Sequence, residues 1–190
     1  DNIGCLTLGT LRGTEMPDIM PKIQGTKALV IDLRNYPEYL VYQLGRYFLK
    51  RPTAFARLSG MDSSYPGVFR LGPVQYIKSS PGPVYSGKVV ILVDELTQSL
   101  AEYTTMALRA APGATVVGST TAGADGNVSY LVLPGNMHTA ISGLGVYYPD
   151  GRETQRVGIV PDVEVKPTIK GITEGRDEVL ERAVQLIKAG

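Results

Sequence analysis

The chain has 190 residues, of which 43% are hydrophobic and 19% are charged, and its formal net charge is +1. This length fits one domain with a substantial core, and the composition is that of a globular protein rather than a disordered one. The near-neutral charge gives no reason to expect a nucleic-acid partner, and no apolar run approaches the length of a membrane span. The sequence opens at Asp1 without a Met or a leader peptide, so we expect it to be part of a longer protein whose upstream domains lie outside it.

The first elements read along the chain are a strand and a short helix. Ile3–Leu8 has the composition of a strand, and we expect Cys5 to be buried in it, since free cysteine is among the most buried residue types. Because this cysteine is the only one, an internal disulfide is excluded, and no Cys and His spacing indicates a metal site. Met16–Ile23, which contains two prolines, predicts a short helix or an irregular crossover.

Two strand–turn–helix units follow. Ala28–Leu33 and Val89–Val93 are short apolar runs rich in β-branched residues, typical of strands buried on both faces of a parallel sheet. Apolar residues at helical spacing follow each run, over Tyr39–Leu49 and from Leu100 to Ala111. Because parallel strands end at the same edge of a sheet, we expect the two turns to lie together there and to form a cleft.

Ser99 stands where the second of these helices should begin. With Glu102 it forms the pattern S-x-x-E, a capping box in which the two side chains satisfy free N–H groups at a helix start. A hydroxyl in this place can also serve as a nucleophile, because the helix N–H groups beside it would stabilise an oxyanion. The local pattern allows both roles.

The remaining segments predict surface features and one more helix. Residues 51–82 are rich in Pro, Gly, Ser and Tyr and predict a long loop or a hairpin excursion that could wall a cleft. Beyond Gly118, strand-like pieces alternate with turns, and His138 falls near a hairpin tip, where we expect an exposed structural histidine. After a linker over Thr168–Gly175, Asp177–Ala189 predicts a docked amphipathic helix.

Four stretches, in order, resemble the S41 family of serine peptidases. VVILVDELTQSLAEYTTMALRAAPGATVVGSTTAG, residues 89–123, resembles the segment that carries the nucleophile. ALVIDLRNYP, Ala28–Pro37, resembles the "DLRxNP" turn before it. GVYYPDG, Gly145–Gly151, resembles a hairpin beyond it, and GIVPDVEV, Gly158–Val165, resembles the "GIxPDxxV" closing strand.

The resemblance implies a fold and an activity. The fold would be the crotonase-like α/β core of the S41 peptidases, a mixed sheet with flanking helices in one domain over residues 1–190. The activity would be that of a C-terminal processing (tail-specific) protease, cleaving peptide bonds of a peptide or protein substrate through an acyl-enzyme on Ser99, without metal or organic cofactor. Family members often bind an extended peptide by strand addition. A homo-oligomer and a periplasmic or cell-surface location are further expectations from the family.

The resemblance also assigns roles around Ser99. The backbone N–H of Leu100 would be the first oxyanion donor. The N–H of Glu38 or Tyr39 would be the second, at the turn where the family usually has Gly-Gly. The family's Ser–Lys dyad places its lysine where this sequence has Ala124, and no lysine occurs between Lys88 and Lys166.

The base is therefore expected from elsewhere, since a serine without a proton acceptor is nearly inert at neutral pH. The tricorn-like branch of the family uses a histidine, which would lie upstream of Asp1, and a glutamate that orients it. Glu153 is the acid near the matching position, and Gln155 matches that position equally well. Asp125 is a further carboxylate that could contact such a histidine, its other role being that of a turn residue.

Two alternatives belong to other functional classes. The first is an S41-like module that has lost its base and binds a peptide or an apolar ligand. The second is a crotonase-type acyl-CoA enzyme.

Overall fold

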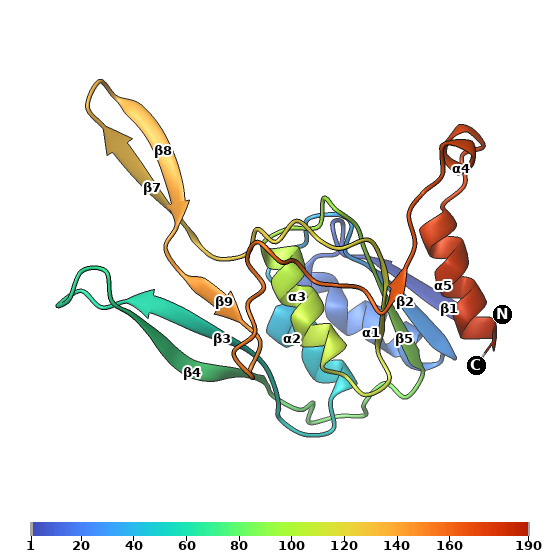
Figure 1. The fold of residues 1–190 in the computed structure, drawn as a ribbon. Coiled ribbons are helices and arrows are strands. Elements are labelled where there is room, and N and C mark those ends of the chain that lie inside the picture. The colour runs from blue at the N-terminus through green and yellow to red at the C-terminus, as the bar shows by residue number, and fades with distance from the viewer. Residues whose placement is uncertain (1, 190) are drawn as a thin grey trace.

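A parallel sheet of five strands lies at the centre of the computed structural model, which describes residues 2–189 (Figure 1). All residues of its second strand are buried, as are the apolar residues of its third, which is what uninterrupted β-branched runs predict for strands covered on both faces. The predicted α/β fold is thereby confirmed. The strands in spatial order are β1 (Ile3–Thr7), β2 (Ala28–Asp32), β5 (Lys88–Val93), β6 (Thr115–Gly118) and β10 (Val163–Glu164).

Helices cover both faces of this sheet (Figure 1). Leu29 and Ile31 of β2 belong to the larger hydrophobic core, which also contains residues of the helices on one face. Val30, which points to the opposite side of the strand, packs in a smaller core with Val179 and Ala183 of the last helix. The helices of the first face are α1 (Met16–Gln24), α2 (Val41–Gly45) and α3 (Leu100–Arg109), with short 3-10 turns η1 (Gly13–Glu15) and η2 (Arg46–Phe48), and the helix of the second face is α5 (Glu178–Ala189).

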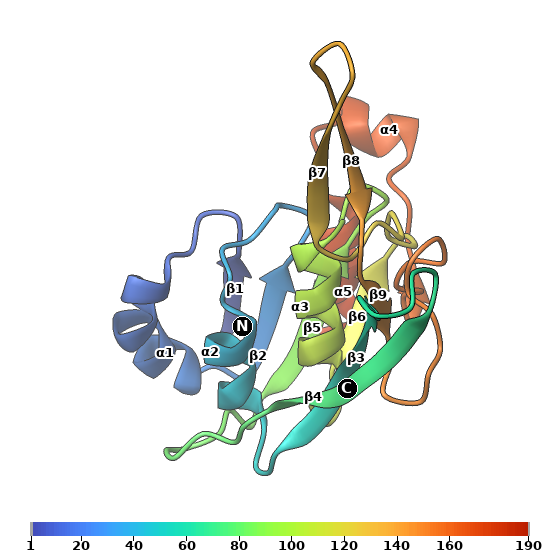
Figure 2. The same ribbon diagram turned by 90° about the vertical axis from the view of Figure 1, so that its left-hand side faces the viewer.

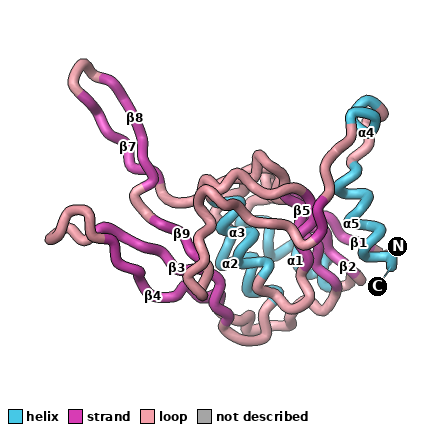
Figure 3. The backbone as a smooth tube through the Cα atoms, viewed as in Figure 1, coloured by secondary structure: helices cyan, strands magenta, loops and turns pink. Residues whose placement is uncertain are grey.

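Two β-hairpin arms extend from the body on the same side (Figures 1 and 2). The excursion predicted over residues 51–82 is an antiparallel hairpin of β3 (Thr53–Met61) and β4 (Phe69–Ile77), and β9 (Gly145–Tyr147) pairs with β3 to complete a second sheet. The other arm consists of β7 (Val128–Leu133) and β8 (Met137–Ser142), whose residues are all exposed. Most of the chain between β9 and β10 is loop (Figure 3).

Two local predictions need correction. Cys5 is exposed rather than buried, because β1 is an edge strand of the parallel sheet and Cys5 lies where little covers it. The predicted linker contains a short helix, α4 (Ile169–Thr173), capped by the hydroxyl of Thr168, which accepts the N–H of Gly171 at 2.9 Å. The C-terminal amphipathic helix is confirmed as α5. No helix within residues 2–189 is long and apolar enough to cross a membrane.

Candidate active site

The turns after β2 and β5 lie together at the carboxyl edge of the parallel sheet, as predicted. The N–H of Leu33 donates to the carbonyl of Leu92 at 3.0 Å, and the hydroxyl of Thr97 donates to the carbonyl of Leu33 at 3.2 Å. Asp94 shapes the second turn, since its Oδ1 accepts the N–H of Thr97 at 2.9 Å. These bonds fix the position from which helix α3 starts.

Ser99, the residue before α3, has a strained backbone. Its φ is 53° and its ψ is −121°, a combination that residues with a Cβ rarely adopt. Conformations of this kind cost on the order of 1–3 kcal/mol and persist where the surrounding structure holds them, often at functional sites. The side chain is half-buried and not sealed in the core.

Glu102 holds this turn and the neighbouring one. Its carboxylate is fully buried and accepts the N–H of Ser99 at 3.1 Å, which is the glutamate half of the predicted capping box. It also accepts the N–H groups of Gly123 and Ala124, each at 2.9 Å, and the hydroxyl of Thr121. Glu102 therefore joins the start of α3 to the turn that follows β6.

A pocket of about 570 Å³ opens beside Ser99. The hydroxyl of Tyr36 donates to Ser99 Oγ at 3.4 Å, and the hydroxyls of Tyr42 and Tyr103 lie 3.2 Å apart. Helices α2 and α3, the second sheet and the loops beside them supply the wall. The lining residues are Tyr36, Tyr39, Tyr42, Leu58, Gln75, Ser99, Leu100, Tyr103, Asp125, Gly126, Asn127, Leu144 and Val146.

Two of the three predicted oxyanion donors border this pocket. Leu100 is the first residue of α3, where an α-helix leaves the N–H without an intrahelical acceptor. Tyr39 also lines the pocket, whereas Glu38 does not. The Glu38 carboxylate instead accepts Arg12 Nη1 at 3.2 Å and the N–H of Gly13 at 3.3 Å, so its charge is held on the η1 side of the turn.

Asp125 is buried in the same pocket. Only 5% of this residue is exposed, and its Oδ1 accepts the N–H of Gly126 at 2.8 Å. Burial, aided by the negative charge of Glu102, raises the pKa of Asp125 to about 7 despite that hydrogen bond. A carboxyl group that titrates near neutrality in a cleft is a candidate for proton chemistry.

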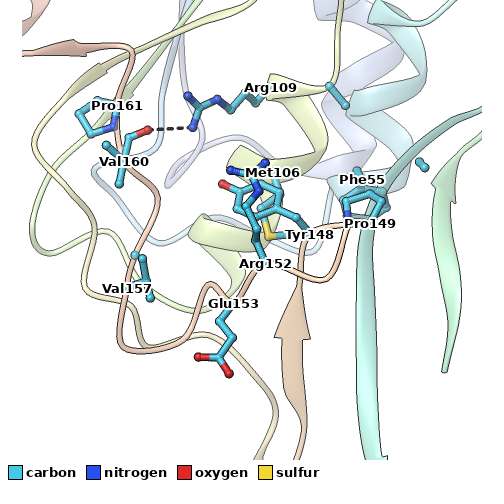
Figure 4. Close-up of a pocket in the computed structure, with 13 residues that line it drawn as sticks. Phe55, Met106, Arg109, Tyr148, Pro149, Arg152, Glu153, Val157, Val160 and Pro161 are labelled. Carbon is cyan, nitrogen blue, oxygen red and sulfur yellow. Dashed lines mark hydrogen bonds between the residues drawn. The ribbon is translucent and has the colours of Figure 1, made fainter. Parts of the chain in front are cut away.

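Glu153, predicted to orient the base, lies in another place. It lines a separate pocket of about 730 Å³ with Met106, Arg109 and Tyr148, which has no residue in common with the Ser99 pocket. Figure 4 shows its carboxylate turned away from the other labelled side chains, and its ion partner is Arg156 at 3.6 Å. This placement argues against the predicted role of Glu153.

Gln155, the other residue that matches the position of the family's orienting glutamate, hydrogen-bonds to backbone groups. Its Nε2 donates to the carbonyls of Asp125 at 2.7 Å and Leu144 at 2.8 Å, and its Oε1 accepts the N–H of Val146 at 3.2 Å. Its amide therefore fixes the wall of the Ser99 pocket.

The single histidine does not border the Ser99 pocket. His138 is exposed on β8, opposite Val132, in the arm that extends away from α3 (Figure 1). Within residues 2–189, no group of three or more His, Cys, Asp or Glu side chains is arranged to hold a metal ion.

Sequence reasoning named Tyr39 only for its backbone N–H and missed the side chains of Tyr36, Tyr42 and Tyr103 as lining of the pocket. Tyr36 lies four residues after the end of β2, in the turn at the sheet edge, and this position could have indicated that it lies near Ser99. Tyr103 lies one helical turn after Ser99 and therefore on the same side of α3. Leu58 and Gln75 could not have been found, since only the second sheet brings them to the pocket.

The chain resembles solved peptidase structures over nearly its whole length. A putative peptidase from Parabacteroides merdae ATCC 43184 superimposes with a TM-score of 0.87 and 22% identity, over 98% of this chain and 61% of that one. Mature CPAF complexed with lactacystin superimposes with a TM-score of 0.78 and 18% identity, over 99% of this chain and 52% of that one. The tricorn protease superimposes with a TM-score of 0.63 and 15% identity, over 99% of this chain and 18% of that one. This chain thus spans between 18% and 61% of the length of these proteins, and at such identities the likeness shows the fold alone.

The family of the chain follows from comparing its sequence with known proteins and with profiles of protein families. No curated protein matches this sequence. The profile of peptidase family S41, however, matches residues 2–165, most of the chain. The protein belongs to peptidase family S41.

Proposed function

We propose that this chain is the catalytic domain of a serine-type endopeptidase in which Ser99 is the nucleophile. The observation that carries the proposal is the strained Ser99, held at the start of α3 by Glu102 and bordering a pocket of about 570 Å³. Strain of about 1–3 kcal/mol at a residue in a cleft is more readily understood as part of a mechanism than as a capping device, which needs no positive φ.

The reaction would proceed in two steps. Ser99 Oγ attacks the carbonyl carbon of the scissile bond while its proton passes to a base, and the resulting oxyanion is stabilised by the N–H groups of Leu100 and Tyr39. The intermediate collapses to the acyl-enzyme, and the protonated base gives its proton to the leaving amine. Water, activated by the same base, then releases the acyl group and restores the Ser99 hydroxyl.

The base would be a histidine supplied from outside this chain. Ala124 stands at the position of the family's lysine, and His138 is on the exposed arm. Imidazole is suited to the task because its ordinary pKa of about 6.5 lets it accept and release a proton near neutral pH.

The substrate would be an extended peptide or protein segment, bound by strand addition beside the pocket. Cleavage near a protein's C-terminus, and action outside the cytoplasm, are the more specific forms of this proposal and follow from the family resemblance alone.

A fluorophosphonate probe tests the proposal in the full-length protein. We expect the probe to label wild-type protein at Ser99, with Ser99→Ala abolishing both labelling and peptide cleavage. Cleavage that persists in Ser99→Ala, or wild-type protein that the probe does not label, would contradict the proposed nucleophile.

The binding-module alternative is favoured by one observation, the cluster of Tyr36, Tyr39, Tyr42 and Tyr103 around the pocket, which offers aromatic surface to an apolar or peptide ligand. It predicts peptide binding without labelling or cleavage, so the same experiment separates it from the peptidase. The acyl-CoA alternative receives no support from the family match.

A further inference from the structure

Asp125 carries an oxygen atom whose position needs an explanation. Its Oδ1 accepts the N–H of Gly126, but its Oδ2 is buried and has no hydrogen-bond partner within residues 2–189. Burying an ionised oxygen without a donor costs several kcal/mol, which is why buried carboxylates are nearly always paired. The unpartnered oxygen belongs to a residue that lines the Ser99 pocket.

Ser99 and Asp125 share the pocket without a hydrogen bond between their side chains. The side-chain contact of Ser99 Oγ is with Tyr36 at 3.4 Å, and Oδ2 of Asp125 has no partner in the described part of the chain. A direct proton transfer between them therefore has no hydrogen bond to follow. A group that joins the two must accept from a hydroxyl and donate to a carboxylate.

Of the two general bases used in the family, only one can do both. A neutral imidazole has one accepting and one donating nitrogen on opposite sides of a rigid ring, whereas a protonated lysine only donates. The hydrogen-bonding needs of this hydroxyl and this carboxylate therefore match an imidazole, which is the base that the proposed function requires.

The other carboxylates near the site are not available for this contact. Glu102 already accepts from four donors: the N–H groups of Ser99, Gly123 and Ala124 and the hydroxyl of Thr121. Glu153 lines the separate pocket of Figure 4, and the side chain at position 155 is an amide. Asp125 is thus the carboxylate of residues 2–189 that borders the Ser99 pocket with a free acceptor.

The titratable groups facing Asp125 come from two helices. Glu102 and Tyr103 belong to α3, and Tyr42, whose hydroxyl is 3.2 Å from that of Tyr103, belongs to α2. Burial and the contact with Tyr42 raise the pKa of Tyr103, so the Tyr103 hydroxyl stays neutral at physiological pH. A cation placed beside Asp125 would be attracted by the negative charges of Asp125 and Glu102.

We propose that Asp125 is the positioning residue for the base of Ser99, accepting a hydrogen bond from its N–H through the buried, unpartnered Oδ2. The inference rests on the proposed function. Asp125 fixes the orientation and tautomer of the imidazole, so that the other nitrogen faces Ser99 Oγ. It also stabilises the imidazolium after that nitrogen has taken the proton, and the proton then goes to the leaving amine and not to Asp125.

The test compares full-length wild-type protein with Asp125→Asn. Asparagine keeps an oxygen that accepts the N–H of Gly126 and removes a buried charge, so we expect the variant to fold. Its neutral amide, however, cannot replace the anion that stabilises the imidazolium. We expect kcat to fall by about 10³–10⁴-fold with KM nearly unchanged, as for loss of the orienting carboxylate in other triads. Fluorophosphonate labelling of Ser99 should slow in parallel.

The pH profile separates a positioning role from a structural one. Loss of the anion lowers the pKa of the base, so the acidic limb of the kcat/KM profile should move to lower pH in Asp125→Asn. Asp125→Glu, which keeps the carboxylate on a longer side chain, should recover part of the lost rate. The exposed Asp150→Asn serves as the matched control, with an unchanged rate and profile.

Three outcomes would overturn the inference while leaving Ser99 chemistry intact. They are a kcat/KM within about threefold of wild type in Asp125→Asn, an acidic limb that does not move, or a large loss in Glu153→Gln without one in Asp125→Asn. Absence of labelling at Ser99 in wild-type protein would instead overturn the proposed function itself.

Discussion

The carboxylate of Glu102 accepts the backbone N–H of Ser99 at 3.1 Å, so the residue before α3 is held by a side chain from the first turn of that helix. The same carboxylate binds the backbone of Gly123 and Ala124 in the turn after β6. One buried anion thereby connects the carboxyl ends of two adjacent strands.

Removing Glu102 should destabilise the fold strongly. Glu102→Ala leaves four donors without their acceptor, two of them in the buried residues Thr121 and Gly123, and we expect a loss of about 3–5 kcal/mol in the free energy of unfolding. Glu102→Gln should also be costly, because its NH₂ group would face N–H donors. Urea denaturation followed by circular dichroism measures both. Glu164→Gln, at an exposed site, should change stability by less than about 0.5 kcal/mol, and an equally mild Glu102→Ala would refute the argument.

The strain at Ser99 predicts that glycine destabilises the fold less than alanine at this position. Ser99→Ala and Ser99→Gly both remove the hydroxyl, but only glycine adopts a φ of 53° and a ψ of −121° without steric cost. Strain relief of about 1–3 kcal/mol exceeds the extra chain entropy of glycine, about 0.4–1 kcal/mol. Ser99→Gly should therefore be the more stable of the two by about 1 kcal/mol in chemical denaturation. Equal stability would mean that the backbone there is unstrained.

Asp125 predicts a pH-dependent stability of the 1–190 chain. Its pKa is raised from 3.8 to about 7 on folding, so the folded state holds its proton over a range where the unfolded state has released it. The contribution is fully present below about pH 4 and is lost as pH rises through 7, by up to about 4 kcal/mol. The difference in unfolding free energy between wild type and Asp125→Asn should fall accordingly between pH 4 and 8. A constant difference would show that Asp125 titrates normally.

Arg34 joins the end of β2 to the start of α5. Its guanidinium donates to Asp32 through Nε at 3.0 Å and Nη2 at 2.7 Å, and to Asp177 through Nη1 at 2.8 Å and Nη2 at 2.7 Å. Asp177 in turn caps α5 by accepting the N–H of Leu180 at 3.0 Å. The contact with Asp177 joins segments 143 residues apart, so the sequence alone does not reveal it.

This double pairing requires the shape of a guanidinium. Arg34→Lys keeps the charge but cannot form two bidentate contacts, so we expect it to lose nearly as much stability as Arg34→Ala, about 2–3 kcal/mol, since the group is largely buried. Thermal denaturation of the two variants provides the measurement. Recovery of wild-type stability in Arg34→Lys would show that charge alone suffices.

The features that were predictable from sequence are those encoded by neighbouring residues. The apolar runs at Ala28–Leu33 and Val89–Val93 predict buried parallel strands, and the polar turn before Ser99 places that residue at the sheet edge. The glutamate of the capping box also behaves as its spacing predicts. In each case local composition and tertiary packing favour the same structure.

The features that were missed depend on pairings between distant segments. The exposure of Cys5 follows from β1 being an edge strand, which its own composition does not reveal. The separation of Glu153 from Ser99 follows from the path of the long loop between β9 and β10. Asp125 resembles an ordinary Gly-flanked turn residue until Glu102, Gln155 and Tyr103 close around it.

Both sheets contribute to the pocket beside Ser99, and they supply different parts of it. The parallel sheet supplies the turns that hold Ser99 and Asp125, whereas the antiparallel sheet supplies Leu58, Gln75 and Val146. Substitutions in β3, β4 or β9 can therefore reshape what the pocket accepts without disturbing the hydrogen bonds around Ser99. Such an arrangement lets descendants of one ancestor diverge in selectivity while their chemistry is inherited unchanged.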